Sequence, residues 1–158
     1  MPLHAVVIDE RTSERGSEAQ HVEWDANIRE FLSKADAFVE GTATLYVCVT
    51  EQRFVLDFRN DDDKEILFVT IPHERLSEHI TEYIDIVRQI ADADGINQME
   101  ALDMAKKVTH DRAGRVLKRE LRDLGFDLEA SRRLFTLLLS LRVDTTRLVG
   151  IHGHRRIR

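Results

Sequence analysis

The stretch MEALDMAKKVTHDRAGRVLKRELRDLGFDLEASRRLFTLLLSLR, residues 99–142, decides the fold of this chain. Its last part, residues 134–141, is almost entirely apolar and predicts a buried helix at the centre of the domain. Asp127 is a favourable N-cap, so this helix is expected over residues 128–142. A cationic segment that contains His110 precedes it, so one stretch holds both the expected core and the expected binding surface.

Two short helices are expected ahead of the central one. Asn97 and Glu100 resemble a capping box at the start of a helix over residues 97–109. Gly114 is unfavourable inside a helix, so residues 110–114 are interpreted as a break. A second short helix then covers residues 115–124, and Gly125 closes it.

The first half of the chain predicts strands around one helix. A first strand is expected at residues 3–9, a loop at 10–20 and an amphipathic helix at 21–34. Three further strands, joined by links too short for a parallel crossover, form an antiparallel meander over residues 43–50, 53–59 and 65–71.

The clearest amphipathic helix begins near Pro72 and ends at Asp94 and Gly95. Apolar residues recur along one of its faces at helical spacing. They are Leu76, Ile80, Tyr83, Ile84, Val87 and Ile90.

The order of these elements predicts an α+β fold. A small, mostly antiparallel sheet, made of the N-terminal strand and the three-strand meander, packs against a C-terminal helical layer. We expect a single domain over residues 1–143, followed by a flexible basic tail over residues 144–158.

Composition favours a soluble cytoplasmic protein. Cys48 is the single cysteine, which fits a reducing compartment, and no apolar run approaches the roughly 20 residues that span a membrane. Residues 1–102 carry 9 Lys and Arg against 22 Asp and Glu, whereas residues 103–158 carry 14 against 7. Either the two halves pack together and neutralise each other, or the basic half faces an anionic partner.

The cationic segment is the first candidate site. Its side chains could converge on one phosphate or carboxylate, helped by backbone N–H groups of a helix that starts after Gly114. The alternative is a solvated helix face on which interspersed Asp and Glu residues neutralise the cations. The cations concerned are Lys106, Lys107, Arg112, Arg115, Lys118 and Arg119, together with His110.

Arg132 and Arg133 open the central helix and form the second candidate. They are expected to make salt bridges to the acidic half, for example to the turn at residues 61–63 or to Glu82. The alternative is a fork that holds an acidic ligand.

Enzymatic and metal chemistry have weaker signals. His110 and Asp111 could form an acid–base pair, but no Ser or Cys nucleophile with a recognisable motif accompanies them. The spacing of His73 and His79, the residues 61–63 and the tail motif at residues 152–154 do not make a convincing metal site. The sequence therefore predicts no metal, no cofactor and no catalytic residue.

Three segments carry a resemblance to a known family. They are VVIDE (residues 6–10), EALDMAKKVTH (residues 100–110) and ASRRLFTLLLSLR (residues 130–142). With them the chain resembles the uncharacterised protein family 0262, a group of small bacterial proteins. The resemblance implies one domain and a cytoplasmic location, carries no activity, and assigns no role to the tail.

The function expected from the sequence is a non-catalytic interaction or regulatory protein. It would bind a protein partner through the surface of residues 97–124, and self-association is a further expectation. The alternative is an enzyme or ligand-binding domain for a phosphorylated or carboxylated small molecule, held by Lys106, His110 and Arg115. The basic tail would suit nucleic acid, but the acidic pI of about 5.6 argues against it.

Overall fold

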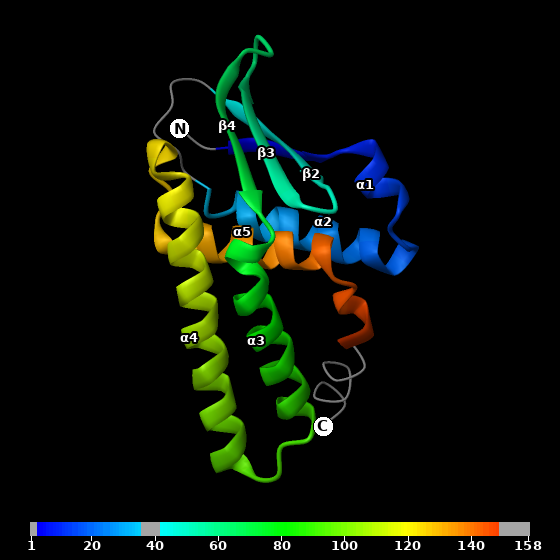
Figure 1. Cartoon of the computed structure of the whole chain (residues 1–158), viewed down its shortest axis with the longest axis vertical. Coiled ribbons are helices and arrows are strands. Elements are labelled where there is room, and N and C mark those ends of the chain that lie inside the picture. The colour runs from blue at the N-terminus through cyan, green and yellow to red at the C-terminus, as the bar shows by residue number, and fades with distance from the viewer. Residues whose placement is uncertain (1–2, 36–41, 149–158) are drawn as a thin grey trace.

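The computed structural model describes residues 3–35 and 42–148. A four-stranded sheet is covered on one face by α2 and α5, and the α3–α4 hairpin projects beyond the sheet (Figure 1). The elements are β1 (Leu3–Ile8), α1 (Glu10–Glu14), α2 (Glu18–Leu32), β2 (Ala43–Val49), β3 (Arg53–Asn60), β4 (Glu65–Pro72), α3 (Glu74–Ala91), α4 (Ile96–Glu120), α5 (Leu128–Arg142), and the 3-10 helices η1 (Arg122–Leu124) and η2 (Thr145–Leu148).

The sheet has the order β1-β2-β3-β4 and confirms the α+β class. The predicted meander is confirmed, because β2 and β3 pair antiparallel and so do β3 and β4. β1 pairs with β2 in parallel, which makes the sheet mixed. The chain between β1 and β2 contains α1 and α2 and supplies the crossover that parallel pairing requires.

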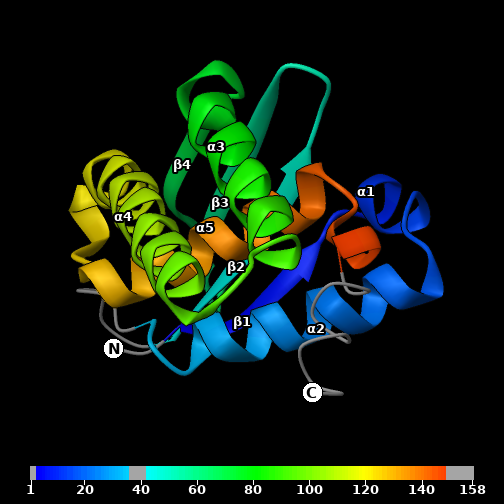
Figure 2. The same cartoon turned by 90° about the horizontal axis from the view of Figure 1, so that it is seen from below.

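α5 is the central buried helix and has the bounds predicted from the sequence. Asp127 Oδ1 accepts a hydrogen bond from the backbone N–H of Ala130 at 2.8 Å, as expected of an N-cap. α2 lies beside α5 (Figure 2) and is fixed by two polar contacts. Trp24 Nε1 donates to the carbonyl oxygen of Ser140 at 2.9 Å, and Asn27 Nδ2 donates to Ser140 Oγ at 3.0 Å.

The predicted break at residues 110–114 is wrong, because α4 continues without interruption from Ile96 to Glu120. Gly114 is fully enclosed at the contact with α5. A Cβ atom there would lie 2.9 Å from Arg132 Cγ and 3.1 Å from Leu128 Cδ1. The glycine therefore permits close approach of two helices, and this packing outweighs its helix-propensity cost of about 1 kcal/mol.

The loop expected at residues 10–20 is also wrong, since α1 and the first turn of α2 lie there. Asp9 caps α1 by accepting from the backbone N–H of Arg11. Ser17 and Gln20 form a capping box at the start of α2, with each side chain accepting from the other residue's backbone N–H. Two local capping signals in a polar segment therefore produce helices that apolar periodicity did not indicate.

The boundaries around α3 differ from those expected. Pro72 is the last residue of β4, and α3 begins two residues later at Glu74. The capping box expected at Asn97 is wrong, because Gly95, at φ 88°, is the N-cap of α4. The predicted apolar face of α3 is largely confirmed. Its buried members are Leu76, Ile80, Val87 and Ile90, while Tyr83 and Ile84 are partly buried.

The segment after α5 begins with η2, whose Leu148 is buried. The rest of the expected tail, residues 149–158 with His152 and His154, lies outside the described residues. Within the described ranges, no helix combines the length and apolar character needed to cross a membrane.

We expect Gly114→Leu to lower the free energy of unfolding by about 2–3 kcal/mol, because the added side chain overpacks the contact between α4 and α5. Ala101→Leu is the matched control, since Ala101 is exposed on the same helix and its change should stay within about 0.5 kcal/mol. Urea denaturation measures both variants. Equal stability of the two would contradict the close-packing role of Gly114.

Candidate functional site

A groove of about 410 Å³ lies where α3, α4 and α5 meet, and it gathers most of the predicted site residues. Five of the seven line it, namely Lys106, Lys107, His110, Arg132 and Arg133. Tyr83, Asp103 and Thr136 complete the lining. Residues 26 positions apart in sequence, His110 and Thr136, are joined here by a direct hydrogen bond.

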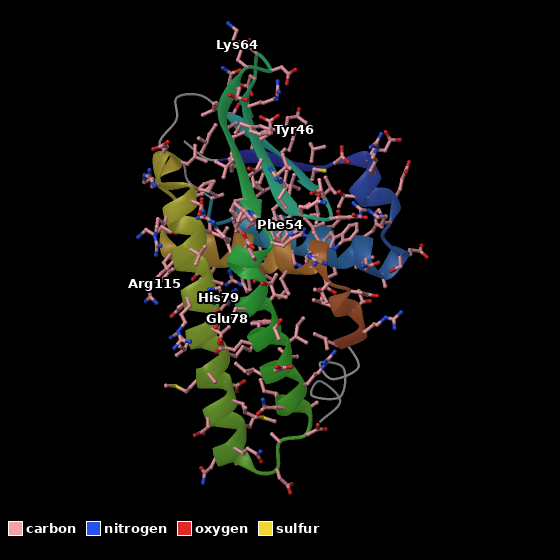
Figure 3. The ribbon with its side chains drawn as sticks, viewed as in Figure 1. Tyr46, Phe54, Lys64, Glu78, His79 and Arg115 are labelled. Atoms are coloured by element: carbon pink, nitrogen blue, oxygen red, sulfur yellow. The ribbon has the colours of Figure 1, made fainter. Side chains whose placement is uncertain are left out.

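The other two predicted residues lie outside this groove. Arg112 is exposed and forms an ion pair with Glu82 of α3 at 3.7 Å. Arg115 extends from the outer side of α4, away from the rest of the domain (Figure 3). Because α4 is continuous, the helix N-terminus expected after Gly114 does not exist, and its N–H groups cannot contribute to an anion site.

Arg132 and Arg133 share one carboxylate, that of Glu129 one turn earlier on α5. Arg132 Nη1 and Arg133 Nη2 lie 3.0 Å from its two different oxygens. Arg132 Nε also lies 3.1 Å from Asp111 Oδ1. The salt bridges expected of these arginines are therefore present, but not with the predicted partners at residues 61–63 or Glu82. A longer contact of 3.9 Å links Arg133 to Glu30 in the acidic half.

His110 forms the floor of the groove. Its ring packs against the rings of Tyr83 and Phe135, with centroid distances of 5.8 and 5.7 Å. Nε2 lies 2.9 Å from the carbonyl oxygen of Arg132 and 2.8 Å from Thr136 Oγ1. Because a carbonyl oxygen only accepts, we assign the proton to Nε2, which donates to it.

Burial, as the largest cause, and the positive charges of Arg132, Arg133 and Lys106 together lower the pKa of His110 to about 4. The hydrogen bond to the Arg132 carbonyl oxygen opposes this shift without reversing it. The imidazole is therefore neutral at pH 7 and adds no charge to the groove. Asp111, the proposed acid–base partner, instead forms its ion pair with Arg132.

The two lysines are the remaining cations of the groove. Lys107 is exposed and makes no ion pair with any residue that the structure describes. Lys106 is half-buried, with its Nζ 5.7 Å from the centre of the Tyr83 ring. A cation over an aromatic face is attracted by the ring's negative charge distribution, so the Tyr83 ring helps to hold the Lys106 ammonium group.

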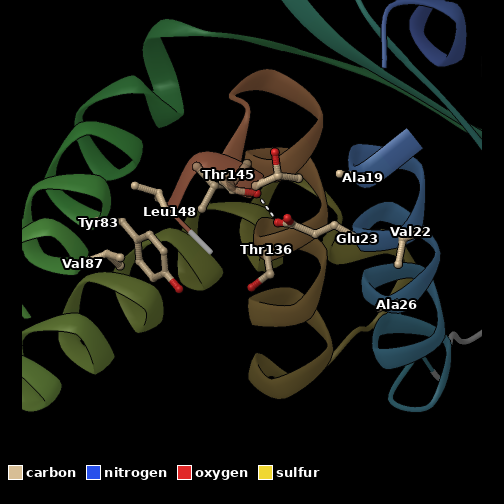
Figure 4. A pocket seen from close by; sticks show the side chains of 11 residues that line it. Ala19, Val22, Glu23, Ala26, Tyr83, Val87, Thr136, Thr145 and Leu148 are labelled. Carbon is tan, nitrogen blue, oxygen red and sulfur yellow. Dashed lines mark hydrogen bonds between the residues drawn. The ribbon is translucent and has the colours of Figure 1, made fainter. Parts of the chain in front are cut away.

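A second, apolar cavity of about 650 Å³ adjoins this groove and was not predicted from the sequence (Figure 4). Its walls come from α2, α3, α5 and η2. Tyr83 and Thr136 line both the cavity and the groove. The sequence signal for it is the apolar face of α3, whose helical periodicity predicts a core position.

The remaining reactive side chains have structural contacts. His73 Nε2 lies 2.6 Å from the carbonyl oxygen of Thr50, and Cys48 Sγ lies 3.9 Å from the hydroxyl of Thr12. Within residues 3–35 and 42–148, no group of three or more His, Cys, Asp or Glu side chains is placed to hold a metal ion.

The chain belongs to the uncharacterised protein family UPF0262, whose model matches residues 2–144. This match covers the whole groove and most of the apolar cavity. No solved structure matches the chain.

Bacterial relatives with the same family description are moderately similar to this chain. A UPF0262 protein of Cereibacter sphaeroides is 31% identical over 107 residues, which cover 65% of this chain and 68% of the relative. One from Rhodopseudomonas palustris is 30% identical over 103 residues, 63% of each chain. One from Paramagnetospirillum magneticum is 26% identical over 107 residues. The matched region thus spans about two thirds of these relatives.

We expect His110 to make the protein less stable in acid. The unfolded chain binds a proton at the ordinary pKa of 6.5, whereas the folded protein binds it only near pH 4. Stability is therefore unaffected by His110 above pH 6.5 and falls as the pH drops from 6.5 to 4. Relative to His110→Gln, which keeps a donor for the Arg132 carbonyl oxygen, the wild type should lose about 2–3 kcal/mol more between pH 7.5 and 4.5.

Urea denaturation at the two pH values measures this difference, and titration of the other groups cancels between the variants. If the wild type and His110→Gln lose equal stability, the imidazole titrates normally in the folded protein.

Proposed function

We propose that this protein binds a small molecule with a carboxylate or phosphate group in the groove between α4 and α5, without catalysing a reaction on it. The observation that carries the proposal is the gathering of Lys106, Lys107, Arg132 and Arg133 around one groove. Asp103 is the only carboxylate residue among the described residues of the lining. A cytoplasmic location fits the single cysteine of the chain.

The electrostatics of the groove support an anion. The charges of Arg132, Arg133 and Lys106 each disfavour protonation of His110, which means that the potential at the groove floor is positive. Glu129 already sits between the two arginines and balances part of their charge. The lysines add their positive charge to that of the arginines, and the arginines supply further donors at the edge of the groove.

The hydrogen bonding of His110 argues for binding rather than catalysis. A general base for the Thr136 hydroxyl would need an unprotonated nitrogen facing it. Nε2 faces both that hydroxyl and the Arg132 carbonyl oxygen and carries the proton. Among the described side chains that line the groove, none is a Ser or Cys nucleophile.

A protein partner on the surface of residues 97–124, self-association and nucleic-acid binding through the tail stay predictions of the sequence. Met104 and Val108, 67% and 45% exposed on α4, support a protein contact. The ligand groove has the stronger support, because it joins predicted residues from two helices and is concave, whereas these apolar residues lie along a single helix.

We expect inorganic phosphate to bind the groove saturably, which nuclear magnetic resonance of the ¹⁵N-labelled full chain would measure. Backbone amide signals of residues 103–110 and 132–136 should shift during the titration. Lys106→Ala/Lys107→Ala should weaken binding at least about tenfold, since it removes two charged donors from the groove.

The matched control is Arg115→Ala/Lys118→Ala, which removes the same charge from exposed positions on the same helix. It should change the affinity by less than about twofold when ionic strength is held constant with chloride. If both double variants weaken binding equally, phosphate is responding to net charge and the groove is not its site.

A further inference from the structure

The cation-lined groove and the apolar cavity share two residues, and this junction indicates what kind of ligand fits. Tyr83 of α3 and Thr136 of α5 line both spaces. Both hydroxyl groups lie on the side away from the hydrogen bond between Glu23 and Thr145 (Figure 4). A molecule that lies past these two side chains would occupy the groove at one end and the cavity at the other.

The cavity itself is built for hydrocarbon. Its walls include Val22, Ala26, Val87, Leu139 and Leu148, from four different elements. Glu23 is the only charged side chain among the described residues that line it, and the Thr145 hydroxyl donates to its carboxylate. Apolar groups entering this space leave water for an apolar surface, which is the main source of binding free energy in such pockets.

The charges at the two ends fix the direction of a bound molecule. The Glu23 carboxylate repels an anion from the cavity, whereas Lys106, Lys107 and Arg133 attract one to the groove. We infer that the ligand is an anionic amphiphile, with a carboxylate or phosphate head in the groove and a hydrocarbon body in the apolar cavity. This inference rests on the proposed function and adds the class of ligand to it.

The size of the site favours a small molecule over a protein segment. The cavity measures about 650 Å³ and the groove about 410 Å³. Both volumes lie within the range of about 300–1,000 Å³ that is typical of small-molecule pockets. A stable protein interface would bury about 800 Å² of each partner on a broader surface. The apolar cavity beside a cluster of cations therefore has room for a charged head and a short hydrocarbon body.

Isothermal titration calorimetry on the full-length protein tests the inference with unbranched carboxylates from acetate to decanoate, all below their micelle concentrations. Affinity should rise about fourfold for each added methylene until the cavity is filled, and then level off. Matched alkyl phosphates separate a carboxylate head from a phosphate head. Decanol, which has the same body without the charge, should bind at least about tenfold more weakly than decanoate.

Two kinds of variant separate the head from the body. Lys106→Ala/Lys107→Ala should weaken every chain length by the same factor and leave the gain per methylene unchanged. Ala26→Phe fills the cavity from a half-buried position and should abolish that gain while inorganic phosphate still binds. Val22→Phe, at a residue 67% exposed, serves if Ala26→Phe does not fold. Ala101→Phe on exposed α4 surface is the control and should behave as the wild type.

The outcomes distinguish this inference from the proposed function. Phosphate binding in the groove without any dependence on chain length overturns the inference and leaves the proposed function standing. Equal binding of decanol and decanoate, unaffected by the lysine changes, overturns both. If the protein binds amphiphiles only in vesicles and not as dissolved monomers, its ligand is a membrane surface, and the inference is overturned. No binding of any chain length means that the cavity is closed to ligands, which also overturns it.

Discussion

The close contact between α4 and α5 at Gly114 is the constraint on which the rest of the structure depends. A glycine at this position lets the backbone of α4 approach the Arg132 side chain to a distance that a Cβ atom would not tolerate. His110 lies one turn away on the same face of α4, so the same approach brings its ring to the Arg132 carbonyl oxygen and to Thr136. Core packing and groove geometry therefore have one cause.

This contact also explains the unusual state of His110. The ring is enclosed by Tyr83 and Phe135 and lies beside two arginines, so a charge on it would be desolvated and repelled. Its proton is committed to a backbone carbonyl oxygen. A histidine that seemed suited to acid–base chemistry from its neighbours in sequence acts in the structure as a neutral link between α4 and α5.

The sequence was sufficient for the sheet and for α5, because those elements carry strong local signals. Alternating strands with short links determine the meander, and Asp127 with the apolar run determines both ends of α5. Gly114 was misinterpreted because its helix propensity is local information, whereas its role depends on Arg132 and Leu128 of another helix. Burial of that contact outweighs a propensity cost of about 1 kcal/mol.

The candidate site was predictable only in part, for the same physical reason. The cations concentrated in the basic half of the sequence indicated the groove. Five of the seven predicted site residues line it, while Arg112 and Arg115 lie outside, and this division depends on α4 being one continuous helix.

The apolar cavity could not be foreseen, because its walls come from residues as far apart as Val22, Val87 and Leu148. Each of these is an ordinary apolar residue on its own element, and only the arrangement of four elements leaves space between them. Tyr83 and Thr136 then acquire a role that neither has in its own helix. Each combines a ring or methyl group with a hydroxyl group, which suits the boundary between a hydrocarbon body and a charged head.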